Sequence, residues 1–90
     1  MVTLGEMKQY LRVDFDDDDS LIQDLIIGAV KLCRDICRLD GEEDLAEVEN
    51  AKVAVLYAVS YMYENREDAD HHQLTMSLRS LLFSAHEGGF

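Results

Sequence analysis

The chain has 90 residues, enough for one small domain, and 48% of them are apolar, which excludes a wholly disordered protein. Eight Lys and Arg against nineteen Asp and Glu give a net charge of −11. Such a chain lacks the basic face with which nucleic-acid readers neutralise phosphates, and it is repelled by anionic membranes. The composition therefore favours other proteins as partners.

The sequence predicts a soluble intracellular protein. No apolar run approaches the roughly 20 residues of a membrane-spanning helix, and the first residues lack the basic stretch and apolar block of a secretory signal. Cys33 and Cys37 stand four residues apart in a helical pattern. That spacing suits two buried small side chains better than a disulfide, in keeping with a reducing compartment.

Two helices are expected in the first half of the chain, which contains no proline. Thr3 followed by Glu6 is a capping-box pattern before a first helix that ends near residues 11–12. The acid run 16–19 favours the positive end of a second helix, expected over residues 18–38. The apolar positions of these two helices repeat every three or four residues: Leu4, Met7 and Leu11, then Ile22, Leu25, Ile26, Ala29, Val30, Cys33, Ile36 and Cys37.

Two more helices are expected in the second half. Gly41 is a stop signal, and the acidic residues 42–44 open a third helix that reaches to about residue 65. Between residues 51 and 63 this helix is apolar nearly all round, so it is either central or covered by a partner outside the monomer. Polar residues 66–73 predict a loop before a last helix over about residues 75–85. The predicted fold class is all-α: one domain over residues 1–90, a small bundle of about four helices with a long second and third helix.

Two groups of residues carry side chains that bind metals. An EF-hand loop counted from Asp14 would need Gly and Glu where Asp19 and Leu25 stand, so capping charge explains the acid run better than calcium. The cysteine pair with His71 and His72 could supply zinc ligands. Zinc sites normally show tighter Cys-x-x-Cys spacing, and the cysteines fall on an apolar stripe. We expect no metal and no cofactor.

Catalysis has no recognisable sequence signature in this chain. Nucleophilic catalysis needs an activated Ser or Cys with a base and an orienting group, and no known motif places them here. A glycine-rich phosphate loop is also absent. Because a thin helical chain leaves little room for a pocket, we expect no enzyme and no catalytic residues.

The end of the third helix carries the aromatic residues Tyr57, Tyr61 and Tyr63. Core packing explains such a run, and aromatic enrichment also marks protein interfaces, so both interpretations stay open. Arg66 and Arg79 are among the few cations in the second half. They suit surface solvation, an intrahelical pair or bridges between subunits. The candidate subunit-interface residues are Tyr61, Glu64, Arg66 and Arg79. Tyr61 belongs to the aromatic run, and the other three are isolated opposite charges near an apolar helix, which can fix register.

Several segments resemble one family of small tailed-phage and prophage proteins. They are residues 2–14 (VTLGEMKQYLRVD), the acidic connection 16–19 followed by residues 20–22 (SLI), residues 63–67 (YENRE), and Leu81-Leu82 in the last helix. Their order and spacing cover nearly the whole chain. The chain resembles the head–tail connector (adaptor) proteins, which are often labelled as possible DNA-packaging proteins.

The resemblance implies a structural subunit that assembles into a ring beneath the portal vertex of a filled capsid. The implied partners are further copies of the chain, the portal protein and the next head-completion or tail protein, with no membrane. DNA would pass through the channel without specific binding, since acid facing the lumen repels it. Head-to-tail contacts close into rings when the rotation permits. The implied location is the head–tail junction of the virion, and the host cytoplasm during assembly.

A second class of function also needs an acidic exterior. A small acidic regulator could mask a basic protein surface, as DNA mimics and some antitoxins do. The order of the motifs favours the connector. Portal, protease and capsid genes upstream would support the connector, whereas a paired toxin or nuclease gene would support the regulator.

Overall fold

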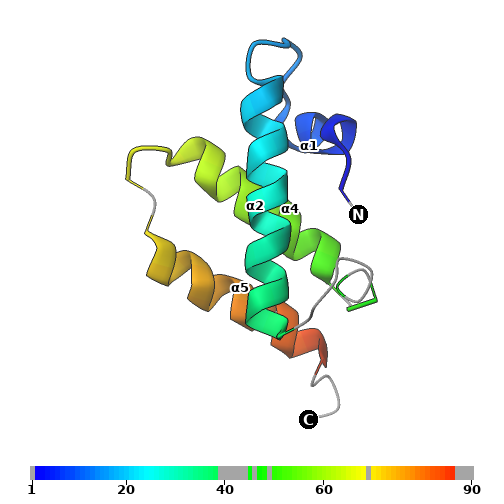
Figure 1. Ribbon diagram of the computed structural model, residues 1–90, viewed down its shortest axis with the longest axis vertical. Helices are drawn as coiled ribbons and strands as arrows, with labels where there is room; N and C mark the ends of the chain where they lie inside the picture. The colour runs from blue at the N-terminus through cyan, green and yellow to red at the C-terminus, as the bar shows by residue number, and fades with distance from the viewer. Residues whose placement is uncertain (1, 39–44, 46, 49, 69, 87–90) are drawn as a thin grey trace.

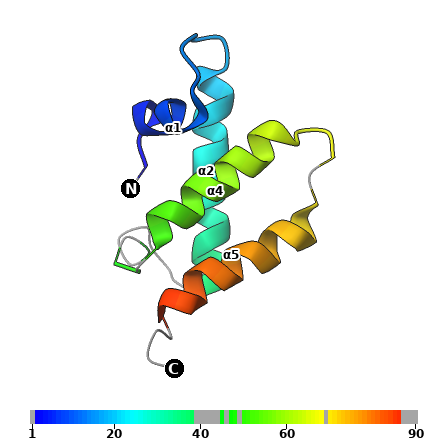
Figure 2. The same ribbon diagram turned by 180° about the vertical axis from the view of Figure 1, so that it is seen from behind.

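The computed structural model describes residues 2–38, 45, 47–48, 50–68 and 70–86. Across them the chain forms four helices and no strand: α1 (Leu4–Leu11), α2 (Asp19–Cys37), α4 (Ala51–Glu64) and α5 (His71–His86). In Figure 1, α4 and α5 cross behind α2, and α1 lies near the end of α2 where that helix begins. Figure 2 shows α4 and α5 running in opposite directions on this one side of α2. The predicted all-α bundle is confirmed.

The predicted capping box begins α1. The Glu6 amide donates to Thr3 Oγ1 at 3.1 Å, and the Thr3 amide donates to Glu6 Oε1 at 3.0 Å. These reciprocal bonds satisfy two backbone donors that a helix N-terminus leaves without partners. Arg12 ends the helix in the left-handed region (φ 61°), and the Val13 amide donates to the Lys8 carbonyl at 2.9 Å.

The second helix also follows its prediction closely. It extends from Asp19 to Cys37 and ends at Arg38, which again takes a left-handed conformation (φ 58°). The buried residues Ile22, Ala29 and Cys33 lie on its predicted apolar stripe. The helix could be predicted from sequence periodicity because its buried face requires an apolar residue every three or four positions along its length.

The third helix is shorter than predicted. Residues 47, 48 and 50 lie in a turn and a bend, and Asn50 has φ 67°, so α4 begins only at Ala51. Asn tolerates the left-handed region better than most residues, and one residue in that conformation interrupts a helix. The expectation of one continuous helix from residue 42 was wrong at these positions. The acidic opening 42–44 lies outside the described residues.

The last helix begins earlier than predicted. Residues 71–73, expected in a loop, form the first turn of α5. Asp70 is the reason: its carboxylate accepts a hydrogen bond from the Gln73 amide at 3.0 Å, and its carbonyl accepts from the Leu74 amide at 2.9 Å. An Asp in this role satisfies free amides and favours the positive end of the helix dipole.

The hydrophobic core surrounds α4, which contacts α1, α2 and α5. Its residues Ala51, Ala54, Val55, Ala58 and Val59 are almost fully buried. Of the two alternatives that the sequence left open, the structure supports the first: α4 is the central helix of the bundle. Its apolar surface is not completely covered, because the side chain of Val53 is 52% exposed. No helix in the described part of the chain is long and apolar enough to cross a bilayer.

Two substitutions in α5 test this assignment of the core. Leu78 is fully buried, whereas Met76, two residues earlier, is 56% exposed. Leu78→Ala leaves a cavity and should lower the free energy of unfolding by about 2–5 kcal/mol. Met76→Ala should change it by less than about 0.5 kcal/mol. Urea unfolding of the dilute monomer measures both, and equal effects would contradict the packing of α5.

Candidate functional site

The connection between α1 and α2 is a short loop rich in carboxylates, residues 13–18, called the acidic loop below. The left-handed Arg12 turns the chain into it, and Val13 is buried against the core. At its other end the Asp19 amide donates to the Asp16 carbonyl at 3.2 Å. Both ends of the acidic loop are therefore held by defined backbone contacts.

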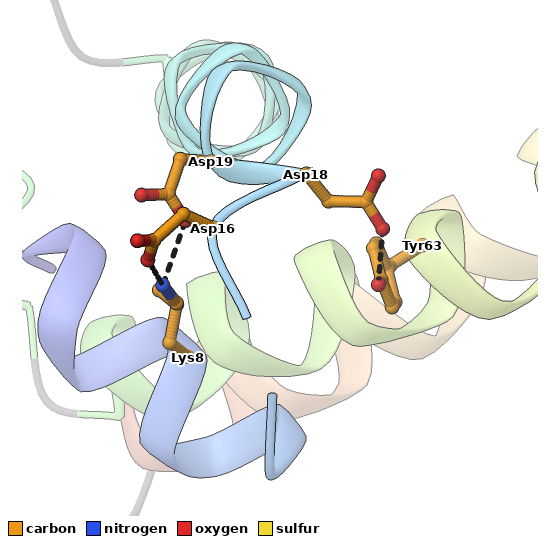
Figure 3. A network of polar contacts seen from close by, with 5 residues as sticks. All are labelled: Lys8, Asp16, Asp18, Asp19 and Tyr63. Carbon is orange, nitrogen blue, oxygen red and sulfur yellow. Dashed lines mark hydrogen bonds and ion pairs between the residues drawn. The ribbon is translucent and has the colours of Figure 1, made fainter. Parts of the chain in front are cut away.

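Lys8 anchors the acidic loop to α1. Its ammonium lies 2.8 Å from Asp16 Oδ1 and 2.8 Å from Asp19 Oδ1, and Figure 3 shows it between the two carboxylates. Asp19 Oδ1 is shielded from solvent and makes no hydrogen bond of good geometry, so the ammonium is its counter-charge. The hydrogen bond to Asp16, then the close contact with the Asp19 carboxylate, raises the pKa of Lys8. The same hydrogen bond from Lys8 lowers the pKa of Asp16.

Tyr63 anchors the acidic loop to the end of α4. Its hydroxyl donates to Asp18 Oδ2 at 2.7 Å, a contact between residues 45 positions apart (Figure 3). This hydrogen bond is the main reason why the pKa of the Tyr63 hydroxyl is raised. The Arg66 guanidinium lies 5.3 Å from the centre of the Tyr63 ring, within cation–π range. Asp18 precedes α2 but makes no side-chain cap bond, so local capping alone does not explain the acid run.

A second ion pair links α1 directly to α4. The Lys52 ammonium donates to Glu6 Oε2, and this bond is the main cause of the lowered pKa of Glu6. Lys52 lies in the first turn of α4, whereas Tyr63 lies in its last. The two ends of α4 therefore hold α1 and the acidic loop, respectively.

The anchored loop presents an aromatic side chain to solvent. Phe15 is 51% exposed, and Asp14 and Asp17 on either side are exposed. Because burial is what makes a Phe side chain favourable, the exposed half of Phe15 gains no such stabilisation in the monomer. The loop therefore combines rigid attachment with a surface suited to a protein contact.

The predicted interface residues do not form one cluster of contacts. Tyr61 stacks on Tyr57 with ring centres 6.5 Å apart, and its hydroxyl accepts from the Asp70 amide at 3.0 Å. It therefore supports the junction of α4 and α5. Arg66 lies over Tyr63, while Glu64 and Arg79 are exposed on α4 and α5. Their role between subunits stays a prediction.

The cysteines are free thiols inside the bundle. Cys33 is fully buried and Cys37 half-buried, as expected for small apolar side chains. Burial raises the pKa of the Cys33 thiol to about 12 and also raises the pKa of Cys37. His71 and His72, predicted in a loop, are exposed in the first turn of α5. Among the described residues, no group of three or more His, Cys, Asp or Glu is arranged to hold a metal ion.

Comparison with known families identifies the chain. A family model described as "Phage gp6-like head-tail connector protein" matches residues 1–87. The chain belongs to this family. The suspected connector family is thereby confirmed, and with it a structural role in the phage particle that involves other head and tail proteins. A search of curated proteins and a search of solved structures each found no match.

The Lys8 anchor makes a prediction about the pH dependence of this connector protein's stability. Lys8→Met should lower the free energy of unfolding at pH 7. The pKa of Asp16 is lower in the folded protein than in the unfolded chain. Its ion pair therefore adds to the free energy of unfolding at pH values above its unfolded pKa of about 4, and this stabilisation is lost as the pH falls through the folded pKa. The pKa of Lys8 is higher in the folded protein than in the unfolded chain. Its stabilisation is therefore complete at pH values below its unfolded pKa of about 10.4, and it is lost as the pH rises through the folded pKa.

The difference in free energy of unfolding between the wild type and Lys8→Met should therefore be largest from about pH 5 to pH 10 and smaller at lower and higher pH. Urea unfolding across pH measures it. Lys31→Met is the matched control, since Lys31 is exposed and lies outside the ion pairs of the described residues. An equal loss in both variants would contradict the anchor.

Thiol labelling tests the burial of the cysteines. Iodoacetamide should modify Cys37 well before Cys33 in the folded protein, because Cys33 is inaccessible and its pKa is about 12. Peptide mass spectrometry after timed quenching measures the two rates. In urea the two rates should converge, whereas faster labelling of Cys33 in the folded chain would contradict the packing of α2.

Proposed function

We propose that this connector protein forms a closed ring between the portal and the tail, and that the ring extends the DNA channel during head completion and tail attachment. The observation that carries the proposal is the family match over residues 1–87. In this account the whole chain acts as one connector domain. It works as a structural protein of the virion, not as an enzyme.

The charge of the chain supports a channel role. Each subunit contributes a net charge of −11, so a ring of many copies would be strongly anionic. An anionic lumen lets DNA pass because the wall repels the phosphates instead of binding them. This favours passage of DNA over specific binding.

The exposed apolar side chains support self-association. Five large apolar residues are at least half exposed in the described part of the chain: Tyr10, Phe15, Ile27, Val53 and Met76. They lie on α1, the acidic loop, α2, α4 and α5, so several faces could meet a neighbour. A small domain with a thin core also gains stability when an oligomer buries some of these residues.

The acidic-regulator alternative rests on net charge alone. Both functions need an acidic exterior, and membership of a structural connector family favours the ring. A regulator would act as one copy on a basic protein surface, whereas a ring subunit must contact its own copies. Self-association therefore separates the two functions.

Light scattering of the purified chain tests the ring. The measurement is a concentration series at physiological salt, where a Debye length of about 8 Å limits repulsion between the acidic subunits. The expected result is a rise from the 10.3 kDa subunit to a discrete multiple of it, alone or with portal protein added. A mass of one subunit under both conditions would contradict the proposal and favour the regulator.

A further inference from the structure

The outer face of α2 has an apolar hollow with no side chain of the described residues in it. Ile27 is 68% exposed, the highest value among the large apolar residues. Beside it lies a hollow of about 170 Å³ lined by Ile26, Ile27, Val30 and Arg34. Pockets for drug-sized ligands span roughly 300–1,000 Å³, so this hollow suits a single side chain.

A basic stripe continues from this hollow along the same face of α2. Lys31 and Arg34 follow Ile27 by four and seven residues, a spacing that keeps them on one side of the helix, and Arg38 follows at its C-cap. None of the three takes part in an ion pair within the described residues. Arg34 Nε is shielded from solvent and has no hydrogen-bond partner there.

Such a stripe is unusual in this chain. The other lysines, Lys8 and Lys52, are paired with carboxylates, and the net charge is −11. A shielded Nε–H without an acceptor costs free energy. A partner that supplies an acceptor to Arg34 therefore gains more binding free energy than it would by contacting an exposed arginine. The face therefore fits a partner that combines an apolar side chain with carboxylates.

The acidic loop has this chemistry. Phe15 is half exposed between Asp14 and the exposed pair Asp16 and Asp17. Its backbone is anchored through Lys8 and Tyr63, so little conformational freedom is lost when the loop binds.

We propose that Phe15 of one subunit occupies the hollow on α2 of a second copy, with Asp14 and Asp17 facing Lys31 and Arg34. This inference rests on the proposed ring and names the contact that builds it. An aromatic side chain in an apolar hollow supplies the affinity, and the charges around it select the orientation.

The contact has to be made between two molecules. The acidic loop precedes the first turn of α2, whereas Arg34 lies 15 residues after Asp19 in the same helix. At 1.5 Å per residue the lining of the hollow lies about 10–22 Å along the helix from Asp19. Lys8 and Tyr63 hold the acidic loop at α1 and α4, and no described side chain fills the hollow, so Phe15 does not occupy the hollow of its own chain. Two complementary surfaces at different places on one subunit make a head-to-tail contact, which adds subunits until a ring closes.

Complementary variants test the contact. Phe15→Asp removes the inserted side chain but keeps the hollow, and Ile27→Asp spoils the hollow but keeps Phe15. Each should weaken self-association by roughly ten- to a hundredfold, as expected for the loss of one buried large apolar side chain. An equimolar mixture should form a complex of one copy of each, with twice the 10.3 kDa subunit mass and no further growth.

Two controls introduce the same charge at other exposed apolar positions. Val53→Asp on α4 and Met76→Asp on α5 replace side chains that are 52% and 56% exposed. They should associate like the wild type. Circular dichroism should show unchanged helix content in all four variants, because each altered side chain is at least half exposed in the monomer.

The outcomes separate this contact from the proposed ring. Analytical ultracentrifugation of the variants and the wild type, alone and with portal protein, is the measurement. A wild type that never associates overturns both. A wild type that forms rings while Phe15→Asp also does so overturns the contact alone. An Ile27→Asp chain that forms rings but no longer joins the portal assigns the hollow to the portal and also overturns the contact.

Discussion

The burial of α4 is the constraint on which the rest of this structure depends. Its inward face carries Ala51, Ala54 and Ala58, whose short side chains let neighbouring helices approach closely. The helix contacts α1, α2 and α5. At its two ends Lys52 and Tyr63 bind Glu6 of α1 and Asp18 of the acidic loop. One buried helix thereby fixes both the core and the position of the most acidic surface segment.

Local sequence patterns were enough to place the first two helices. The Thr3–Glu6 capping box and the apolar stripe of α2 act over three or four residues, so they can be read without knowledge of the fold. The start of α5 was also encoded locally, since Asp70 with Gln73 three residues later is a capping pattern. It was missed because the surrounding polar residues suggested a loop. The break at Asn50 depended on a left-handed backbone conformation that apolar periodicity does not report.

The contacts that hold the acidic loop could not be predicted from spacing. The bond between Tyr63 and Asp18 joins residues 45 positions apart, and the pairing of Lys8 with Asp19 depends on how α1 packs beside α2. From the sequence, the acid run is predicted to be helix-capping charge, and Tyr61 and Arg66 are predicted to lie at a subunit interface. The structure gives these two residues contacts inside the subunit. Such long-range polar contacts follow from packing, so they appear only once the helices are placed.

The surface of the connector protein is therefore divided. Carboxylates in the acidic loop are anchored by a lysine and a tyrosine, while Lys31, Arg34 and Arg38 on α2 lie outside the ion pairs of the described residues. Surfaces of opposite charge at separate places on one subunit suit a chain that contacts its own copies in a fixed orientation. In the proposed ring the acidic loop and α2 make the contact between subunits, while α4 maintains the fold.

Hydrogen–deuterium exchange, compared between the monomer and the assembled protein, tests this division most directly. We expect amides of residues 13–18 and of the outer face of α2 to exchange more slowly in the assembly, while amides of the buried helix α4 should change little. Slower exchange confined to α5 and the end of α4 near Glu64 and Arg66, with the acidic loop unchanged, would contradict it.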